Sequence, residues 1–175
     1  MKYFSLLIGL FIGGCTISID GDEYRNATQK FDLEAFFNGE VKAWGIVQGR
    51  RGELVQRFEV DIIGTVENGE LKLDETFTYQ LGDGVEKRIW SIVAHSYGQY
   101  SGSAGDIEGI ATGQVFGNAF NWRYEMDLPV DDTTYRVKFD DWIWAFDDKT
   151  IVNRSYIKKF GITMAEVTIF MQKLG

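Results

Sequence analysis

A two-residue alternation of apolar and polar side chains runs through most of this 175-residue chain, and it constrains the fold more than any other feature. Successive side chains of a β-strand point to opposite faces, so this period predicts strands with one buried face. About nine or ten such strands are predicted, joined by short turns such as Asn68-Gly69. Clear examples are the apolar positions Leu71, Leu73, Phe77 and Tyr79, and Phe120, Trp122, Tyr124, Met126 and Leu128.

The connections between these strands decide the fold class. No long amphipathic helix lies between them, which excludes parallel βαβ units. An antiparallel meander of this size can close on itself and so remove its exposed edges. We therefore predict an all-β fold, an antiparallel up-and-down lipocalin-like β-barrel, with a two-sheet sandwich as the alternative and an outer-membrane barrel as a weaker one. A short N-terminal helix is predicted over residues 31–37, whose apolar side chains have helical spacing.

The first fifteen residues have the pattern of a bacterial lipoprotein signal peptide. Lys2 supplies a positive charge, residues 3–12 are apolar, and Gly13-Gly14 precedes Cys15. The apolar run is shorter than the roughly 20 residues of a membrane-spanning helix and matches a signal-peptide core. Ile12-Gly13-Gly14-Cys15 resembles a lipobox, in which the cysteine is lipidated and the preceding peptide is removed.

This interpretation divides the chain into three parts. Residues 1–14 form a lipoprotein signal peptide, residues 15–30 a lipidated N-terminus and tether, and residues 31–175 a single β-barrel domain. The membrane is then a partner through the lipid on Cys15, and the protein belongs to the cell envelope, facing the periplasm. Thr16 follows the cysteine, where the inner-membrane signal of enteric bacteria is Asp, and this favours the outer membrane.

Two residue types that occur once, cysteine and histidine, exclude several functions together with the net charge. A single cysteine excludes an intramolecular disulfide or a multi-cysteine metal site, and the single His95 excludes a multi-histidine metal centre. No metal or cofactor is therefore predicted. The formal net charge of −8 argues against sequence-independent nucleic-acid binding. The glycine-rich run 101–113 lacks the Lys-Ser/Thr ending of a phosphate-binding loop.

Polar side chains at predicted inward positions are the candidate functional residues. Glu75 has the same parity as Leu73 and Phe77. A buried charge must find a partner or face water, so Glu75 and Arg88 are a candidate pair on adjacent strands. Such a pair either fixes the strand register or forms the polar floor of a ligand cavity. The candidate cavity or buried polar network comprises Glu75, Arg88, Trp90, Asp106, Trp122, Asp140, Trp142 and Arg154.

A set of short motifs, together with the lipobox, resembles a bacterial lipoprotein family known as domain of unknown function 3833. The likeness runs from about Phe36 to the C-terminus, and it implies a lipocalin-like barrel without implying a reaction. The motifs are Trp44-Gly45, Arg57-Phe58, Leu73-Asp74-Glu75-Thr76-Phe77, Arg88-Ile89-Trp90, Ala104-Gly105-Asp106, Gly109-Ile110-Ala111-Thr112-Gly113, Gly117-Asn118-Ala119, Phe139-Asp140-Asp141-Trp142, Asn153-Arg154-Ser155 and Lys159-Phe160-Gly161.

Three functions remain open on these grounds. The leading hypothesis is a binding protein whose barrel holds a fatty acid, a lipid or another hydrophobic ligand. The alternative is a structural or assembly lipoprotein with a filled barrel and a protein partner. A weaker alternative is an enzyme acting on lipids with Asp106, Asp140, Glu75 or His95 as acid or base groups, although no residue is assigned as catalytic.

Overall fold

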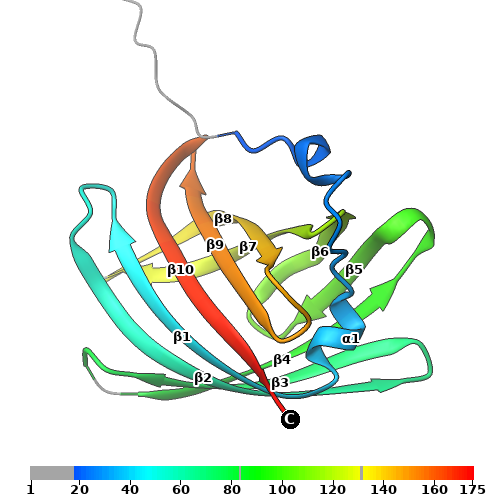
Figure 1. Cartoon of the computed structure of the whole chain (residues 1–175). Coiled ribbons are helices and arrows are strands. Elements are labelled where there is room, and N and C mark those ends of the chain that lie inside the picture. The colour runs from blue at the N-terminus through cyan, green and yellow to red at the C-terminus, as the bar shows by residue number, and fades with distance from the viewer. Residues whose placement is uncertain (1–17, 83, 131) are drawn as a thin grey trace, which may run out of the picture.

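The fold is a closed antiparallel barrel (Figure 1). The computed structural model describes residues 18–175 apart from 83 and 131, so the predicted signal peptide and Cys15 lie outside the described residues. Over the described chain, each strand pairs with its neighbours in sequence, and β1 pairs with β10 to close the barrel. The predicted up-and-down, lipocalin-like barrel is therefore confirmed, and the sandwich alternative is wrong.

Ten strands, one short α-helix and two 3-10 helices make up the described residues. The helices are η1 (Gly21–Tyr24), α1 (Leu33–Phe37) and η2 (Ser96–Gly98). The strands are β1 (Gly39–Gly49), β2 (Leu54–Glu67), β3 (Glu70–Tyr79), β4 (Val85–Ala94), β5 (Gln99–Ala104), β6 (Ile107–Phe116), β7 (Ala119–Val130), β8 (Thr133–Ala145), β9 (Thr150–Lys159) and β10 (Ile162–Leu174). Among these described residues, no helix has the length and apolar character needed to cross a membrane.

The core lies inside the barrel because alternate side chains of every strand point inward. In β2, for example, Phe58, Val60 and Ile62 are buried while Asp61 and Ile63 between and beyond them are exposed. The cluster that these inward residues form takes in side chains from all ten strands and from α1. Burial of apolar surface on this scale is the main favourable term for folding.

Helix α1 closes one end of the barrel. It begins after Asp32, whose Oδ1 accepts a hydrogen bond from Ala35 N at 2.9 Å and so caps the helix. Its buried side chains Leu33, Phe36 and Phe37 join the barrel core, and the helix contacts β1, β2 and β3. Lys173 of β10 donates hydrogen bonds to carbonyl oxygens at the end of the helix. The helix predicted over residues 31–37 is thus present from Leu33 to Phe37.

The N-terminal segment packs on the outside of the barrel. Ile19 and Tyr24 cover a second buried cluster, formed by the outward side chains Ala119, Trp142 and Tyr156. The rings of Tyr24 and Trp142 have centroids 6.3 Å apart, and Phe31 N donates to Gly117 O at 2.8 Å. The predicted tether is therefore bound to the outer wall over its described part, because Ile19 and Tyr24 bury apolar surface there. We refer to residues 18–30 as the N-terminal strap.

Gly64 permits the close contact between α1 and the barrel. A Cβ atom at this position would lie 1.7 Å from the carbonyl oxygen of Phe37, which is backbone and cannot move aside. We predict that Gly64→Ala lowers the free energy of unfolding by about 1–3 kcal/mol, the usual cost of overpacking. Urea denaturation followed by circular dichroism measures this change.

Gly105 supplies the matched control for this prediction. It lies in the β5–β6 turn, and a Cβ atom there would have no neighbour within 4 Å. Gly105→Ala should leave the stability close to that of the wild type. Equal stability of the two variants would contradict the proposed role of Gly64.

Candidate functional site

A cavity of about 690 Å³ occupies the barrel interior. It extends from Leu33 and Phe37 of α1 to Leu128 and Pro129 near the end of β7. This volume lies within the range of small-molecule binding sites, roughly 300–1,000 Å³. The barrel is therefore not filled by its own side chains, which argues against the predicted alternative of a solid structural core.

Aromatic rings form much of the cavity wall. Trp90 lies edge-on to Trp122, with centroids 5.6 Å apart, and edge-on to Tyr124 at 5.4 Å. Tyr124 in turn stacks on Phe139 with a centroid distance of 4.8 Å. These contacts hold the rings in place against one another and present flat apolar faces to the cavity. The aromatic lining residues are Phe37, Phe58, Phe77, Tyr79, Trp90, Phe120, Trp122, Tyr124 and Phe139.

Six charged side chains line the cavity, and four of them form what we call the polar cluster, namely Glu75, Arg88, Asp106 and Asp141. Arg88 donates from Nε and Nη2 to Asp106 Oδ2, at 2.9 and 2.6 Å. Glu75 lies directly opposite Arg88 in the β3–β4 register, as predicted for adjacent strands. The ion pair of Arg88, however, is with Asp106, so the predicted Glu75–Arg88 salt bridge is not formed. The guanidinium turns toward the β5–β6 turn, where the carboxylate of Asp106 can reach it.

Burial changes the proton affinity of two members of the polar cluster. It raises the pKa of Glu75 to about 7, with the nearby Arg88 charge opposing this effect. Burial also raises the pKa of Asp141 to about 7, with the nearby Ser155 hydroxyl and the Arg88 charge opposing this effect. Both carboxyl groups therefore change protonation near neutral pH, in the manner that often marks a functional site.

Asp141 is incompletely hydrogen-bonded. Its Oδ1 atom is buried and has no hydrogen-bond partner among the described residues. The neighbouring β9 presents two further buried polar side chains, and Ser155 lies opposite Asp141 in the register. Ser155 Oγ donates to Asn153 Oδ1 at 3.2 Å, and Asn153 Nδ2 donates to the carbonyl of Trp142 at 3.3 Å. An unpaired buried oxygen of this kind is costly unless something binds to it.

The structure separates the predicted site residues into two groups. Five of them line the cavity, namely Glu75, Arg88, Trp90, Asp106 and Trp122. The other three, Asp140, Trp142 and Arg154, do not line it. Inward side chains on β8 and β9 have odd numbers, as Asp141 and Asn153 do, so even-numbered residues face outward. The prediction placed Arg154 inward with Val152 and Tyr156, and this parity was wrong.

The three outward residues have other contacts. Asp140 accepts hydrogen bonds from Asn121 Nδ2 at 2.9 Å and Arg123 Nε at 3.1 Å, and it also pairs with Lys158. Trp142 is buried beneath the N-terminal strap, whereas Arg154 is exposed beside Glu166. Asp140 therefore belongs to a polar network on the outer wall, and Trp142 to the outer cluster.

Sequence reasoning did not select Asp141, Asn153, Ser155 or Tyr124 as site residues. A signal for the first three was available, because Asp141 has the parity of Phe139 and Ile143, and Asn153 and Ser155 have the parity of Ile151 and Ile157. A polar residue that shares a strand face with buried apolar residues is expected to point into the barrel interior.

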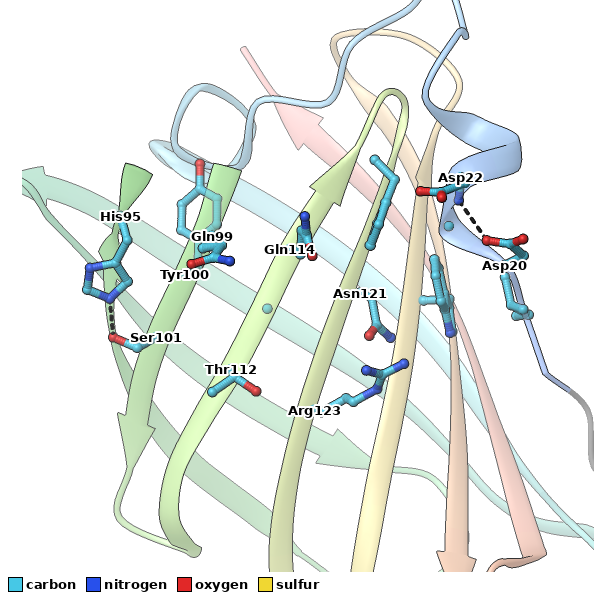
Figure 2. Close-up of a pocket in the computed structure, with 15 residues that line it drawn as sticks. Asp20, Asp22, His95, Gln99, Tyr100, Ser101, Thr112, Gln114, Asn121 and Arg123 are labelled. Atoms are coloured by element: carbon cyan, nitrogen blue, oxygen red, sulfur yellow. Dashed lines mark hydrogen bonds between the residues drawn. The ribbon is translucent and has the colours of Figure 1, made fainter. Parts of the chain in front are cut away.

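A second, polar groove of about 520 Å³ lies on the outer wall beside the N-terminal strap. Figure 2 shows His95 and Ser101 on one side of this groove and Asp20 and Asp22 on the other. His95 Nε2 lies 2.7 Å from Ser101 Oγ. His95 and Asp140 thus do not join Glu75 and Asp106 in the cavity, so the four groups of the predicted enzyme alternative are divided. Across the described chain, no group of three or more His, Cys, Asp or Glu side chains is placed to hold a metal.

Comparison with known proteins gives a family and a fold. The sequence profile of a family described as protein of unknown function (DUF3833) matches residues 9–173. The solved structure of the S-type phycobiliprotein lyase CPES from Guillardia theta has a similar fold, with a TM-score of 0.57. The likeness covers 83% of this chain and 94% of the lyase chain at 10% sequence identity, which shows the fold alone. No curated protein matches the chain.

The raised pKa values of the polar cluster predict a pH-dependent stability. The folded-state pKa of Glu75, about 7, exceeds its ordinary value of 4.5, so the folded protein binds more protons between these values. Protonated Glu75 costs the folded state little, so the contribution of Glu75 to the free energy of unfolding is most favourable below pH 4. This contribution is lost as the pH rises toward 7, because the buried group then ionises in the folded protein. Glu75→Gln should therefore be more stable than the wild type at pH 8, by on the order of 1–3 kcal/mol, and equally stable at pH 4.

Urea denaturation at pH 4, 6 and 8 measures this difference. Glu70→Gln is the control, because Glu70 is exposed at the start of the same strand and makes the same change in charge. A constant difference between Glu75→Gln and the wild type at all three pH values would contradict the assignment.

Proposed function

The chain belongs to the family of proteins of unknown function DUF3833, and we propose that its barrel is a binding domain for a small amphipathic molecule such as a lipid. The observation that carries this proposal is the cavity of about 690 Å³, apolar over most of its wall and charged at one region. An apolar body would gain about 0.8 kcal/mol for each buried CH₂ group. The polar cluster would contact the other end of the molecule.

The shape of the wall suggests how the ligand enters and how it is oriented. Strand β5 has only six residues, and its pairing with β4 begins at Trp90, so residues 85–89 of β4 have no partner on that side. The barrel wall is therefore lower, because it lacks a paired strand, beside Arg88 and Asp106, whose side chains are 21% and 40% exposed. The opposite end of the barrel is closed by α1. A ligand that enters over the low wall would place its apolar part toward α1 and its polar end near the polar cluster.

We also propose that Cys15 is lipidated and anchors the barrel in the cell envelope, facing the periplasm, with the outer membrane favoured. The support is the signal-peptide pattern and the lipobox at residues 12–15. Stable anchoring needs two or three acyl chains, which a bacterial lipoprotein cysteine carries. Only three residues separate Cys15 from Ile19, which packs on the outer wall, and the four Cα–Cα steps between them span at most roughly 14 Å. The barrel would thus stay close to the membrane surface.

Ile169→Trp tests whether the cavity binds ligands. Ile169 lines the cavity, and a larger side chain there would occupy the space of the ligand. We expect the affinity for the neutral fluorescent probe N-phenyl-1-naphthylamine to fall by more than about tenfold. A fluorescence titration of the purified, detergent-free protein measures this affinity.

Phe170→Trp is the matched control for Ile169→Trp. Phe170 is the next residue on β10, and its side chain points outward and is 41% exposed. This variant should bind the probe as the wild type does. Failure of the wild-type protein to bind any apolar probe would contradict the proposed function, as would equal binding by the two variants.

Cys15→Ala tests the proposed anchor. Without the cysteine sulfur there is no site for the lipid, so the protein should leave the membrane fraction and lose incorporation of labelled fatty acid. The barrel should stay folded, because the core is formed by residues after Cys15. Cell fractionation with Ser18→Ala as a control gives the result, and an unchanged membrane fraction for Cys15→Ala would refute lipidation.

A further inference from the structure

We propose that the ligand's polar end is a cation of the amine or quaternary ammonium class, bound by Glu75 and Asp141 among the aromatic rings of the cavity. This inference rests on the proposed function, and it names the ligand chemistry of the same site. It replaces the fatty acid considered from sequence with an amphiphile of opposite charge.

The charge of the cavity lining supports a cation. Its acidic members number five and its basic members one. Three of the acids are already engaged, since Asp106 pairs with Arg88, Asp127 with Arg136, and Glu86 accepts a hydrogen bond from Tyr79. Glu75 and Asp141 remain, and no ion pair is formed by either within the described part of the chain. The acidic members are Glu75, Glu86, Asp106, Asp127 and Asp141, and the basic member is Arg88.

The cavity is poorly suited to a ligand carboxylate. The guanidinium of Arg88 is the basic group among the described lining residues, and it already makes two hydrogen bonds to Asp106. A ligand carboxylate would have to displace Asp106 and lie near the carboxyl groups of Glu75 and Asp141. Repulsion between like charges in a site of low dielectric makes this costly.

The aromatic rings near the polar cluster add to the attraction for a cation. Arg88 Cζ lies 5.6 Å from the ring centroid of Phe77 and 5.9 Å from that of Trp90. These two rings therefore already contact a cation, and Tyr124 lies edge-on to Trp90. Aromatic rings combined with carboxylates are the usual site for quaternary ammonium groups, because the ring faces attract the charge and tolerate the bulk of the methyl groups.

The groups that face the two free carboxylates also predict how binding depends on pH. Glu75 is influenced by Arg88 and Asp106, and Asp141 by Arg88, Asp140 and Glu75. Because burial holds both pKa values at about 7, each carboxyl group is mostly ionised at pH 8 and mostly protonated at pH 5. A cationic ligand should therefore bind more tightly than a neutral or anionic one at pH 8, and most of this difference in affinity should be lost at pH 5.

Three probes with the same ten-carbon chain test the proposal: decyltrimethylammonium, decanol and decanoate. Each is titrated into the purified, detergent-free protein with bound N-phenyl-1-naphthylamine at pH 8 and pH 5. We expect decyltrimethylammonium to bind at least about tenfold more tightly than decanoate at pH 8, and this ratio to shrink at pH 5. Tetramethylammonium, which has no chain, should compete weakly, whereas equal competition would show a site for a small free cation and overturn the amphiphile.

The variants Glu75→Gln and Glu75→Gln/Asp141→Asn assign the effect to the cavity. Each variant should lower the affinity for decyltrimethylammonium and leave the affinity for decanol unchanged. Glu70→Gln is the control, because it makes the same change in charge on an exposed side chain. If the double variant does not fold by circular dichroism, the single variant decides. Binding of decanol with no preference for the cation would overturn this inference alone. Failure of all three decyl probes to bind would overturn the proposed function as well.

Discussion

The pairing of β1 with β10 is the contact on which the rest of this structure depends. It joins the first and last strands over the register from Glu40–Leu174 to Gly49–Ala165, so that each of the described strands has a neighbour on both sides. Closure gives every strand one inner and one outer face, and alternation then assigns each side chain to one of them. The cavity and the outer groove both follow from this single constraint.

Closure also sets the electrostatics of the interior. A carboxyl group that points inward leaves bulk water, and it then needs a partner or a proton. Asp106 is paired with Arg88, whereas Glu75 and Asp141 form no ion pair among the described residues, so the barrel bears the free-energy cost of burying these two carboxyl groups. Under the proposed function, a bound cation would supply the partner that these two groups lack, and the stability lost in their burial would serve binding.

On the outer wall, apolar side chains face solvent and need to be covered. Trp142 and Trp144 point away from the core, and an exposed pair of this size would form an apolar patch. The N-terminal strap covers part of it with Ile19 and Tyr24, and these contacts hold the strap against the outer wall. The N-terminal strap therefore lies on the outer face formed by β6–β9.

Local pattern in the sequence determined the number of strands to within one, their antiparallel order and the helix before them, because alternation, turn residues and helical spacing act over a few neighbouring residues. The inward placement of Glu75, Arg88 and Trp122 was predictable for the same reason. The pairing of Arg88 with Asp106 was not, since it depends on how far a long side chain reaches across a short strand. The outward placement of Asp140 and Arg154 was missed for another reason, because apolar residues occur at both parities in these strands, as Trp142 beside Ile143 and Val152 beside Ile151. Sequence thus determined the elements and most of the wall, and tertiary structure decided which charges meet, because charge pairing depends on distances between strands.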